Sequence, residues 1–221
     1  GFALATDEAK KSFGDDRLLV EKFVAAPRHV EIQLVADAHG NVACFPEREC
    51  SVQRRNQKVV EEAPSPFVHQ RPELRARMQA EAAQLATAVG YTSAGTVEML
   101  VDATTADFYF LEMNTRLQVE HPVTEAVSDQ DLVALMLRVA DGQALPSELV
   151  GSVPPKGWAI ESRIYAEDAA RGFVPSTGSL TAYATPPSAI EFFHASDIRV
   201  DAAVEDGSEV GIHYDPMISK V

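Results

Sequence analysis

The sequence predicts an α+β fold in which antiparallel hairpins build a sheet and helices flank it. Two apolar segments, 94–101 and 108–113, are separated by a short polar stretch and have the pattern of a hairpin. A second hairpin is indicated over 30–45, where residues 39–41 (HGN) supply the turn. The segment 73–89 has the spacing of one long helix, ended by a glycine.

The amino-terminal segment predicts a helix followed by a strand. Thr6 is a candidate N-cap with acidic residues behind it, and Gly14 is the expected end of the helix. The apolar run 18–24 predicts a strand that carries Glu21 and Lys22 in its middle. These two charges indicate either a salt-bridged edge or a point where the backbone meets a ligand.

The next strand, 29–37, alternates between a polar and an apolar face. Its polar side carries His29, Glu31 and Gln33, and its other side is expected to face the core. Residues 64–72 then read as a proline-bounded linker. In the helix that follows, four apolar residues are predicted to point inward: Leu74, Met78, Leu85 and Val89.

A shorter helix and a change of composition follow. The helix 131–140 is expected to be capped by Ser128 or Asp129 and ended by Gly142. Residues 145–157 contain three prolines and mark the expected domain boundary. Beyond it the chain predicts a strand over 158–165 that carries Glu161 and Arg163, and then short strands at 180–183 and 198–200.

Length and charge exclude several classes of protein. The chain has 221 residues, 46% of them hydrophobic, which indicates a cored globular protein. A net charge of -14 argues against a nucleic-acid binder or an anionic-membrane binder, because both need an excess of Lys and Arg. No signal peptide or membrane-spanning apolar run is present. Cys44 and Cys50 lack metal-ligand spacing and are expected to be packing residues in a reducing compartment.

Single acids stand in both strands of the central hairpin. If the turn closes a five-residue loop, Glu98 faces Glu112 across the strands. Two facing carboxylates repel, so we expect either a shared proton or divalent cations, with Mg²⁺ or Mn²⁺ suited to oxygen ligands. Arg116 is the competing explanation, because it could pair with one of the acids.

Polar side chains continue past the second strand at alternating positions. If the segment stays extended, they share one side of it. They are Glu112, Asn114, Arg116, Gln118 and Glu120. Upstream, QRRNQK (53–58) is the densest basic cluster of this acidic chain and suits a polyphosphate or a carboxylate. Neutralisation of the cluster by Glu61 and Glu62 is the alternative.

Seven segments, in order, resemble the biotin carboxylase component of biotin-dependent carboxylases. They are SFGDDRLLVEKF, PRHVEIQ, ERECSVQRRNQKVVEEAP, AGTVEML, FYFLEMNTRLQVEHPVTE, ESRIYAED and YDPMISK. The sequences of these segments, notably SFGDDRLLVEKF and QRRNQK, are most similar to those of the biotin-containing alpha subunit of propionyl-CoA or acetyl-CoA carboxylase. The resemblance implies an ATP-grasp domain over 1–148, with an antiparallel sheet and flanking helices, and part of the β-rich biotin carboxylase C-terminal domain over 157–221.

The resemblance also implies an activity. The protein would be a ligase that uses ATP to carboxylate carrier-bound biotin with bicarbonate through carboxyphosphate. Its partners would be a biotin carboxyl carrier domain outside this chain and a carboxyltransferase (beta) subunit, in an oligomer. Its location would be the cytoplasm in a bacterium and the mitochondrial matrix in a eukaryote.

Roles of single residues follow from the resemblance in the same way. Glu98, Glu112 and Asn114 would hold two Mg²⁺ or Mn²⁺ ions. Arg116, Gln118 and the backbone of Val119 would bind bicarbonate, and Glu120 would deprotonate it. Lys58 would stabilise carboxyphosphate, and Arg163 the enolate of biotin. The nucleotide pocket would be formed by Glu21, Lys22, Val24, His29, Gln53 and Leu100.

The chain departs from the family pattern at several points. Asn56 stands where many members have His. The family's amino-terminal domain, glycine-rich lid and Met-Lys-Met attachment motif are not in these residues, and the chain starts without Met. We therefore expect part of a longer protein that is inactive by itself. Two alternatives remain at this point, a catalytically silent ATP-grasp scaffold and an ATP-grasp ligase for another acid.

Overall fold

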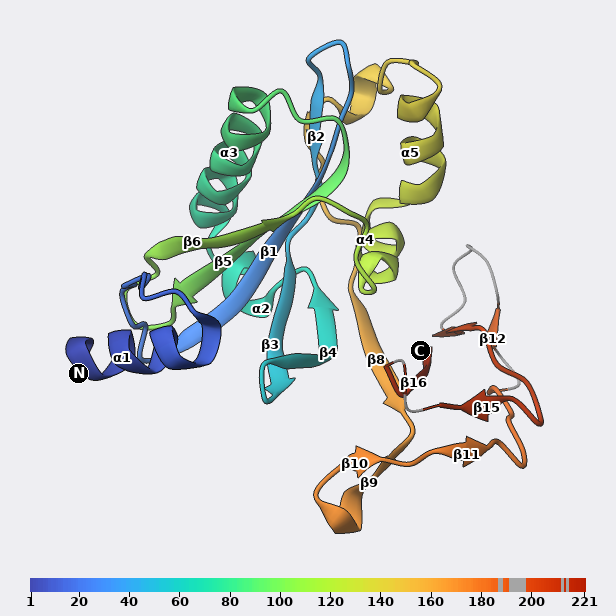
Figure 1. Cartoon of the computed structure of the whole chain (residues 1–221). Helices are drawn as coiled ribbons and strands as arrows, with labels where there is room; N and C mark the ends of the chain where they lie inside the picture. The colour runs from blue at the N-terminus through green and yellow to red at the C-terminus, as the bar shows by residue number, and fades with distance from the viewer. Residues whose placement is uncertain (187–188, 191–197, 212, 214) are drawn as a thin grey trace.

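The computed structural model describes residues 1–186, 189–190, 198–211, 213 and 215–221. Figure 1 shows a twisted sheet with helices on its faces and a strand-rich region that hangs from β8. The α+β prediction is confirmed. The helices are α1 (Phe2–Phe13), α2 (Pro66–His69), α3 (Pro72–Ala88), α4 (His121–Ser128) and α5 (Leu132–Ala140), with 3₁₀ turns η1 (Ser147–Leu149) and η2 (Ala169–Arg171).

The main sheet has ten strands in the described part of the chain, and its longest path runs β14-β16-β8-β4-β3-β1-β2-β7. On its other side β1 pairs with β5, which pairs with β6. These strands are β1 (Pro27–Ala36), β2 (Val42–Cys44), β3 (Arg48–Arg54), β4 (Gln57–Ala63), β5 (Ser93–Asp102), β6 (Phe108–Asn114), β7 (Gly151–Ser152), β8 (Ala159–Tyr165), β14 (Asp201–Ala202) and β16 (Met217–Lys220). Three two-stranded pairs use β9 (Glu167–Asp168), β10 (Val174–Pro175), β11 (Gly178–Ser179), β12 (Ala189–Ile190), β13 (Ile198–Arg199) and β15 (Glu209–Val210).

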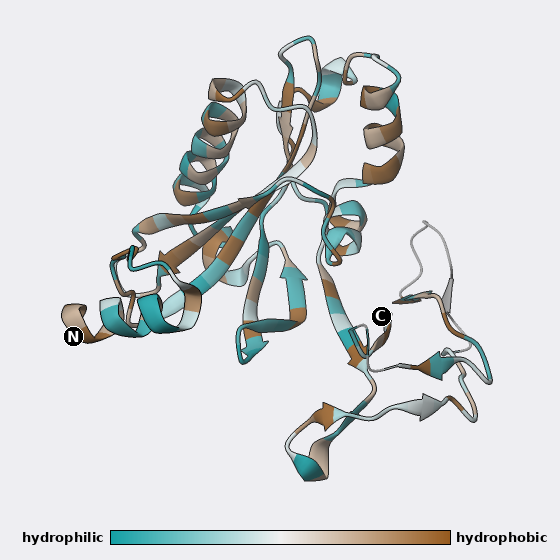
Figure 2. Ribbon diagram, in the orientation of Figure 1, coloured by the Kyte–Doolittle hydropathy of each residue, from teal (hydrophilic) through white to brown (hydrophobic). Residues whose placement is uncertain are grey.

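The core between α3 and the sheet uses the apolar face of β1. Ile32 and Leu34 are fully buried in one cluster with Leu74 and Met78 of α3. Figure 2 shows hydrophobic residues following β5 beside them and gathering again in α5. The inward prediction is wrong for Val89, which is 63% exposed because α3 ends at Ala88 and the chain turns away.

The polar face of β1 is also buried. Glu31 and Gln33 are 0% exposed, so the predicted alternation holds while both faces lie inside the molecule. Farther along the same face, Val35 packs with Leu132 of α5. This face is therefore divided between an apolar half under α5 and a polar half that borders the cavity described below.

The predicted hairpin of β5 and β6 forms, with an irregular register. Near the turn Val101 pairs with Phe108, one residue out of step with the predicted loop. A shift between Met99 and Glu98 then brings Glu98 opposite Glu112, as predicted. Such a bulge adds one residue to one strand and turns the side chains that follow it.

Strand β6 is not buried, contrary to the expectation from its two apolar faces. Phe110 is 59% exposed and Leu111 is 37% exposed. Within the described residues β6 pairs only with β5, so it forms an edge of the sheet. The apolar composition of β6 therefore does not predict its burial, because burial requires other elements to pack over the strand.

The amino-terminal predictions are partly wrong. Gly14 ends α1 in the left-handed region with φ 73, as expected. Thr6 is not the cap: it lies inside α1 and donates to the Phe2 carbonyl at 3.0 Å. No strand forms over 18–24, where Leu19 and Phe23 are more than 80% exposed, because no neighbouring strand pairs with this segment.

The helix caps seen in the structure correct the predictions for residues 64–72 and for the start of α5. The predicted linker contains the short helix α2, which Ser65 caps by accepting from the Val68 amide. Helix α5 is capped by Asp131, not by Ser128 or Asp129, which belong to the end of α4. Helix α4 itself was not predicted, since its eight residues follow directly on the polar segment.

The carboxyl-terminal part extends the sheet. Strand β8 matches the prediction for 158–165 and pairs antiparallel with β4 and β16. Strand β13 matches the prediction at 198–200, whereas 180–183 contains no strand because β11 ends at Ser179. Cys44 and Cys50 are buried free thiols, as expected. Among the described residues, none of the helices has the length and apolar character needed to span a membrane.

Candidate active site

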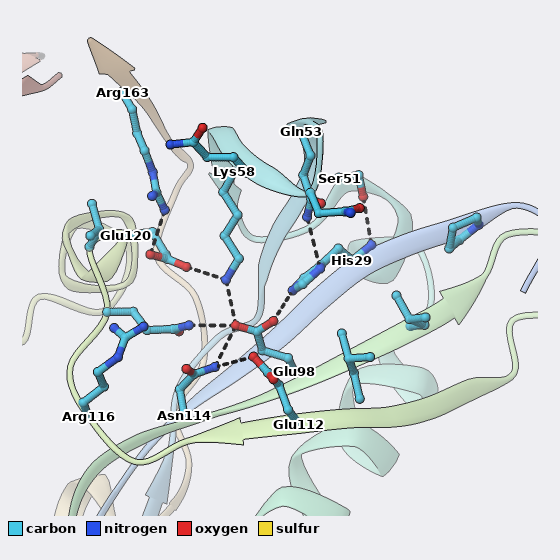
Figure 3. A pocket seen from close by; sticks show the side chains of 17 residues that line it. His29, Ser51, Gln53, Lys58, Glu98, Glu112, Asn114, Arg116, Glu120 and Arg163 are labelled. Carbon is cyan, nitrogen blue, oxygen red and sulfur yellow. Dashed lines mark hydrogen bonds and ion pairs between the residues drawn. The ribbon is translucent and has the colours of Figure 1, made fainter. Parts of the chain in front are cut away.

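A cavity of about 710 Å³ lies on the polar half of the β1 face. It is built from β1, β3, β4, β5, β6 and β8 and from the loop before α4. Twelve residues singled out from the sequence line it: His29, Gln53, Lys58, Glu98, Leu100, Glu112, Asn114, Arg116, Gln118, Val119, Glu120 and Arg163. Figure 3 shows the charged ones converging from opposite walls.

Lys58 on β4 is the centre of the charge network. Its Nζ donates to Glu31 at 2.7 Å, Glu98 at 2.8 Å and Glu120 at 2.6 Å. Burial opposes the charge on Lys58, but the neighbouring carboxylates of Glu31 and Glu120 raise its pKa. The ammonium is thus fixed in place and remains protonated at neutral pH.

Glu98 on β5 is held as a carboxylate by donors from several elements. The His29 Nε2 atom lies 2.7 Å from one oxygen, and Gln118 Nε2 and Asn114 Nδ2 donate to the other at 2.7 and 2.9 Å. Burial would raise the pKa of Glu98, but the hydrogen bonds from His29 and Lys58 lower it to about 2. The same carboxylates, Glu98 and Glu31, outweigh burial at His29 and raise its pKa to about 9.

Glu112 completes the facing pair with less enclosure. It is exposed, and Asn114 Nδ2 links it to Glu98 by donating to Glu112 Oε1 at 3.2 Å. Arg116 does not pair with either acid in the part of the chain that the structure describes; its Nη1 donates to the Leu117 carbonyl at 3.2 Å. One cation that contacts this pair of acids is Lys58 on β4. It donates to Glu98 and not to Glu112.

The oxygen atoms of this pair fit a hard divalent cation. Glu98 Oε2 keeps lone-pair capacity beside its His29 contact, and the carboxylate of Glu112 and the side-chain oxygen of Asn114 lie next to it. Carboxylate and amide oxygens are the ligands of Mg²⁺ and Mn²⁺.

Glu120 stands between two cations. Its Oε1 accepts from Lys58 at 2.6 Å, and its Oε2 accepts from Arg163 Nη2 at 3.0 Å, while the residue is 2% exposed. The expectation that Glu120 lies on an extended strand is wrong. Strand β6 ends at Asn114, and Glu120 is the residue before α4, so a loop carries it into the cavity.

Arg163 on β8 bridges Glu120 and a second buried acid. Its Nε donates to Glu61 Oε1 at 2.7 Å. Glu61 and Glu161 are cross-strand partners in β4 and β8, and both are buried. Burial is the main cause that raises the pKa of Glu61 to about 7 and that of Glu161 to about 8.

The candidate anion-binding residues lie together on the loop between β6 and α4, where they line the cavity. Arg116 is exposed, Gln118 is buried, and the Val119 carbonyl accepts from Lys220 Nζ of β16. The Arg116 guanidinium and the Gln118 amide supply N–H donors to the cavity, as an oxyanion requires.

Three residues that were predicted to contact the nucleotide lie outside this cavity. Glu21, Lys22 and Val24 lie on the irregular segment before β1 and do not line it. Lys22 instead lies over the ring of Tyr109, with its Nζ 4.2 Å from the centroid.

Neutralisation of the basic cluster by Glu61 and Glu62 is not what the structure shows. Arg54 pairs with Glu167 at 2.5 Å, and Lys58 turns into the cavity. Arg55 and Asn56 form the tight turn of the β3–β4 hairpin, both with positive φ.

Three residues at or beside the cavity had no function assigned from the sequence. Glu31 was placed on a polar strand face, and that face was the available signal for its role. Arg48 lies in a run of charged residues with no periodicity to set it apart, yet it is fully buried beside Glu31. Ser51 also lines the cavity and accepts from the His29 amide at 3.1 Å.

Known protein families match both parts of the chain. The family model described as carbamoyl-phosphate synthase L chain, ATP binding domain, matches residues 1–148. The model for the biotin carboxylase C-terminal domain matches residues 161–221.

Individual relatives agree with the family models. The propionyl-CoA carboxylase alpha chain, mitochondrial, of Caenorhabditis briggsae is 55% identical over 222 residues, covering 100% of this chain and 29% of its own length. The propionyl-CoA carboxylase alpha chain of Ruegeria pomeroyi is 53% identical over 234 residues, covering 100% of this chain and 34% of its own length. This chain therefore spans about a third of the curated relatives it matches.

A solved structure shares the fold along nearly the whole chain. The biotin carboxylase domain of Hydrogenobacter thermophilus 2-oxoglutarate carboxylase, in complex with MgADP, ADP and bicarbonate, superposes with a TM-score of 0.84 at 42% identity. The match covers 99% of this chain and 46% of that one. With an ATP-binding domain, a biotin carboxylase C-terminal domain and this fold in one continuous chain, the protein belongs to the biotin carboxylase family of the biotin-dependent carboxylases.

Proposed function

We propose that this chain carries the bicarbonate and metal part of a biotin carboxylase site, which uses ATP to carboxylate carrier-bound biotin. The observation that carries the proposal is Glu120, a buried carboxylate fixed between Lys58 and Arg163 at the wall of the cavity. Glu120 lines the same cavity as Arg116 and Gln118, so a bound anion would lie within the hydrogen-bond reach that a general base needs.

The metal end of the site would lie on β5 and β6, and the nucleotide end on β1, β3 and β5. Glu98, Glu112 and Asn114 would hold two Mg²⁺ or Mn²⁺ ions, which supply electrostatic stabilisation to the ATP phosphates when bound. His29, Gln53 and Leu100 line the same cavity and would contact the nucleotide. Glu21, Lys22 and Val24 would join them only if the segment before β1 folds over the cavity.

The anion end of the site lies beside the loop that precedes α4. Arg116, Gln118 and the Val119 backbone would orient bicarbonate, and Glu120 would take its proton. The bicarbonate oxygen would bond to the γ-phosphorus of ATP, the bond to the β-phosphate oxygen would break, and ADP would leave. Lys58, within 2.6 Å of Glu120, would stabilise the negative charge of the resulting carboxyphosphate. Arg163 would then face the charge that develops on biotin when its ring nitrogen loses a proton.

The wider assignments follow the relatives. We place the domain division as proposed from the sequence, with ATP-grasp residues in 1–148 and the C-terminal domain in 157–221. The biotin would be supplied by a carrier domain and passed to a carboxyltransferase beta subunit within an oligomer. The acyl-CoA would be propionyl-CoA or acetyl-CoA, and the location the mitochondrial matrix or the bacterial cytoplasm according to the source.

The test is ATP cleavage by the intact enzyme with bicarbonate and biotin varied independently. We expect cleavage to require bicarbonate, to be accelerated by biotin, and to fix labelled bicarbonate on biotin. An enzyme that cleaves ATP with another carboxylic acid and ignores bicarbonate would belong to a different ligase class. An intact protein with no ATP cleavage at all would support the silent scaffold.

A further inference from the structure

Arg48, in the first position of β3, uses all of its hydrogen-bonding capacity in the interior. It is 0% exposed, and a guanidinium has five N–H donors and no acceptor. Each donor reaches a different side chain. The acceptors are Glu31 at 2.5 Å from Nε, Gln33 and Thr124 both at 2.9 Å from Nη1, and Thr96 at 3.2 Å and Gln118 at 2.8 Å from Nη2.

These five acceptors come from four parts of the chain. Glu31 and Gln33 lie on β1, Thr96 lies on β5, Gln118 lies in the loop, and Thr124 lies in α4. A buried ion pair adds little net stability compared with an apolar replacement, because desolvation offsets the attraction. What Arg48 contributes is therefore the relative placement of these segments.

The contact with Gln118 fixes which way its amide points. Since Arg48 only donates, the atom of Gln118 that faces it is the carbonyl oxygen. The NH₂ group must then point to the other side, where it donates to Glu98 at 2.7 Å at the cavity wall. A reversed amide would present a carbonyl oxygen to a bound anion and repel it.

Two further contacts lead to the other cavity residues. Glu31 accepts from Arg48 through one oxygen and from Lys58 through the other, at 2.7 Å. Thr124 accepts from Arg48 and is the fourth residue of α4, the helix that begins directly after Glu120. One buried side chain therefore supports the positions of Gln118, Lys58 and Glu120 together.

We propose that Arg48 is a positioning residue for oxyanion binding, acting through the Gln118 amide and through the Glu31–Lys58 pair without touching the anion. The inference deepens the proposed function, since the anion in question is its bicarbonate.

The test is Arg48→Lys in the intact enzyme. Lysine keeps a positive charge near Glu31 but has three N–H donors on one atom, so it cannot reach both Gln118 and Thr124. We expect the KM for bicarbonate to rise about tenfold or more, as for loss of a hydrogen bond to a charged group, while the KM for ATP changes far less.

A double-variant cycle separates positioning from general loss of structure. In a Gln118→Ala background the amide is already gone, so adding Arg48→Lys should raise the KM for bicarbonate much less than it does in the wild type. Equal increases in both backgrounds would show that Arg48 does not act through Gln118 and would overturn the proposal.

A matched control is available on the far side of the sheet. Arg75 on α3 donates two hydrogen bonds to the fully buried Glu47, at 2.6 and 2.7 Å, and neither residue lines the cavity. Arg75→Lys should lower stability and leave the KM for bicarbonate within about twofold, since surface and core changes away from a site act on folding. A rise in that KM equal to the one in Arg48→Lys would overturn the proposal.

A milder variant covers the case in which Arg48→Lys does not fold. Thr124→Val removes one acceptor of Arg48 with little change of volume, and we expect a smaller rise in the KM for bicarbonate. An unchanged KM in that folded variant would contradict the inference. Failure of the proposed function is a separate result, because the wild-type enzyme would then cleave ATP without need of bicarbonate.

Discussion

Glu98 and Glu112 face each other across β5 and β6, although the hairpin starts one residue out of step with that pairing. The register shift beside Glu98 restores the alignment and places both carboxylates at the cavity. Asn114 bonds to both, at 2.9 and 3.2 Å, which holds the pair together without neutralising it. Lys58 and His29 already lie on Glu98, whereas no cationic side chain among the described residues pairs with Glu112, so a divalent cation would add positive charge on the Glu112 side of the pair.

Replacement of Glu112 should weaken metal dependence. Glu112→Gln in the intact enzyme keeps the size of the side chain and removes one negative charge, so the Mg²⁺ concentration needed for half-maximal ATP cleavage should rise about tenfold or more. Glu81→Gln on the exposed face of α3 is the control and should leave it unchanged. Identical Mg²⁺ dependence in wild type and Glu112→Gln would rule out this residue as a ligand.

Replacement of Glu120 should affect every bicarbonate-dependent step. Glu120→Gln removes the proposed base and its charge between Lys58 and Arg163, so both ATP cleavage with bicarbonate and biotin carboxylation should fall by about 10² to 10⁴. Initial rates with saturating ATP are the measurement. Full activity of Glu120→Gln would show that another group takes the proton.

Replacement of Arg163 should separate the two half-steps. Arg163→Gln should reduce biotin carboxylation by about 10² to 10³, since a charge-stabilising donor is lost, while sparing more of the slow biotin-independent ATP cleavage. Because Arg163 also bonds to Glu120, some loss in both assays is expected. Losses equal to those of Glu120→Gln in every assay would mean that the two residues act as one unit.

The buried pair of Glu61 and Glu161 should make β4 and β8 sensitive to pH. Burial raises their pKa values to about 7 and about 8, well above the 4.5 of a solvent-exposed glutamate. The folded state therefore holds protons that the unfolded state has released, so this stabilisation is present at low pH and is lost as pH rises through about 8. Protection factors of β4 and β8 amides should fall as pH rises from 4.5, the usual glutamate pKa, to about 8, the higher of the two raised pKa values.

The charged groups around this pair are Arg163 on β8, Lys220 on β16 and Glu120 before α4. Glu161→Gln should flatten the pH dependence because an amide does not titrate. Asp141→Asn, at the exposed end of α5, is the control and should keep the wild-type profile. A profile of Glu161→Gln that matches the wild type would place the titration elsewhere.

The core of α3 offers a test of burial against sequence pattern. Met78 is 0% exposed and Val89 is 63% exposed, although both were predicted to point inward. Met78→Ala should lower the free energy of unfolding by about 2 to 5 kcal/mol, and Val89→Ala should change it by less than about 0.5 kcal/mol. Denaturant unfolding of the intact protein, followed by probes in α3, measures both. A large effect of Val89→Ala would contradict the position of that side chain.

Local pattern in the sequence determined the hairpins, the α3 helix and the chemistry of the cavity. Glu98 and Glu112 stood out because a charged residue within an apolar strand requires a partner, and that requirement is visible without coordinates. Alternation on β1 likewise marked Glu31 and Gln33 as one face. These signals are short-range, since they depend on the spacing of residues within a strand and across one turn.

Only the tertiary structure decided burial, partners and the path of the loop. Strand β6 is exposed although it is apolar, and the polar face of β1 is buried, because coverage depends on elements distant in sequence. Arg48 has no local signal, yet it lies at the centre of contacts with residues up to 76 positions away. The sequence shows which residues are charged, and the tertiary structure decides which of them are in contact. A charged side chain can be buried only where hydrogen-bonding partners from several segments surround it.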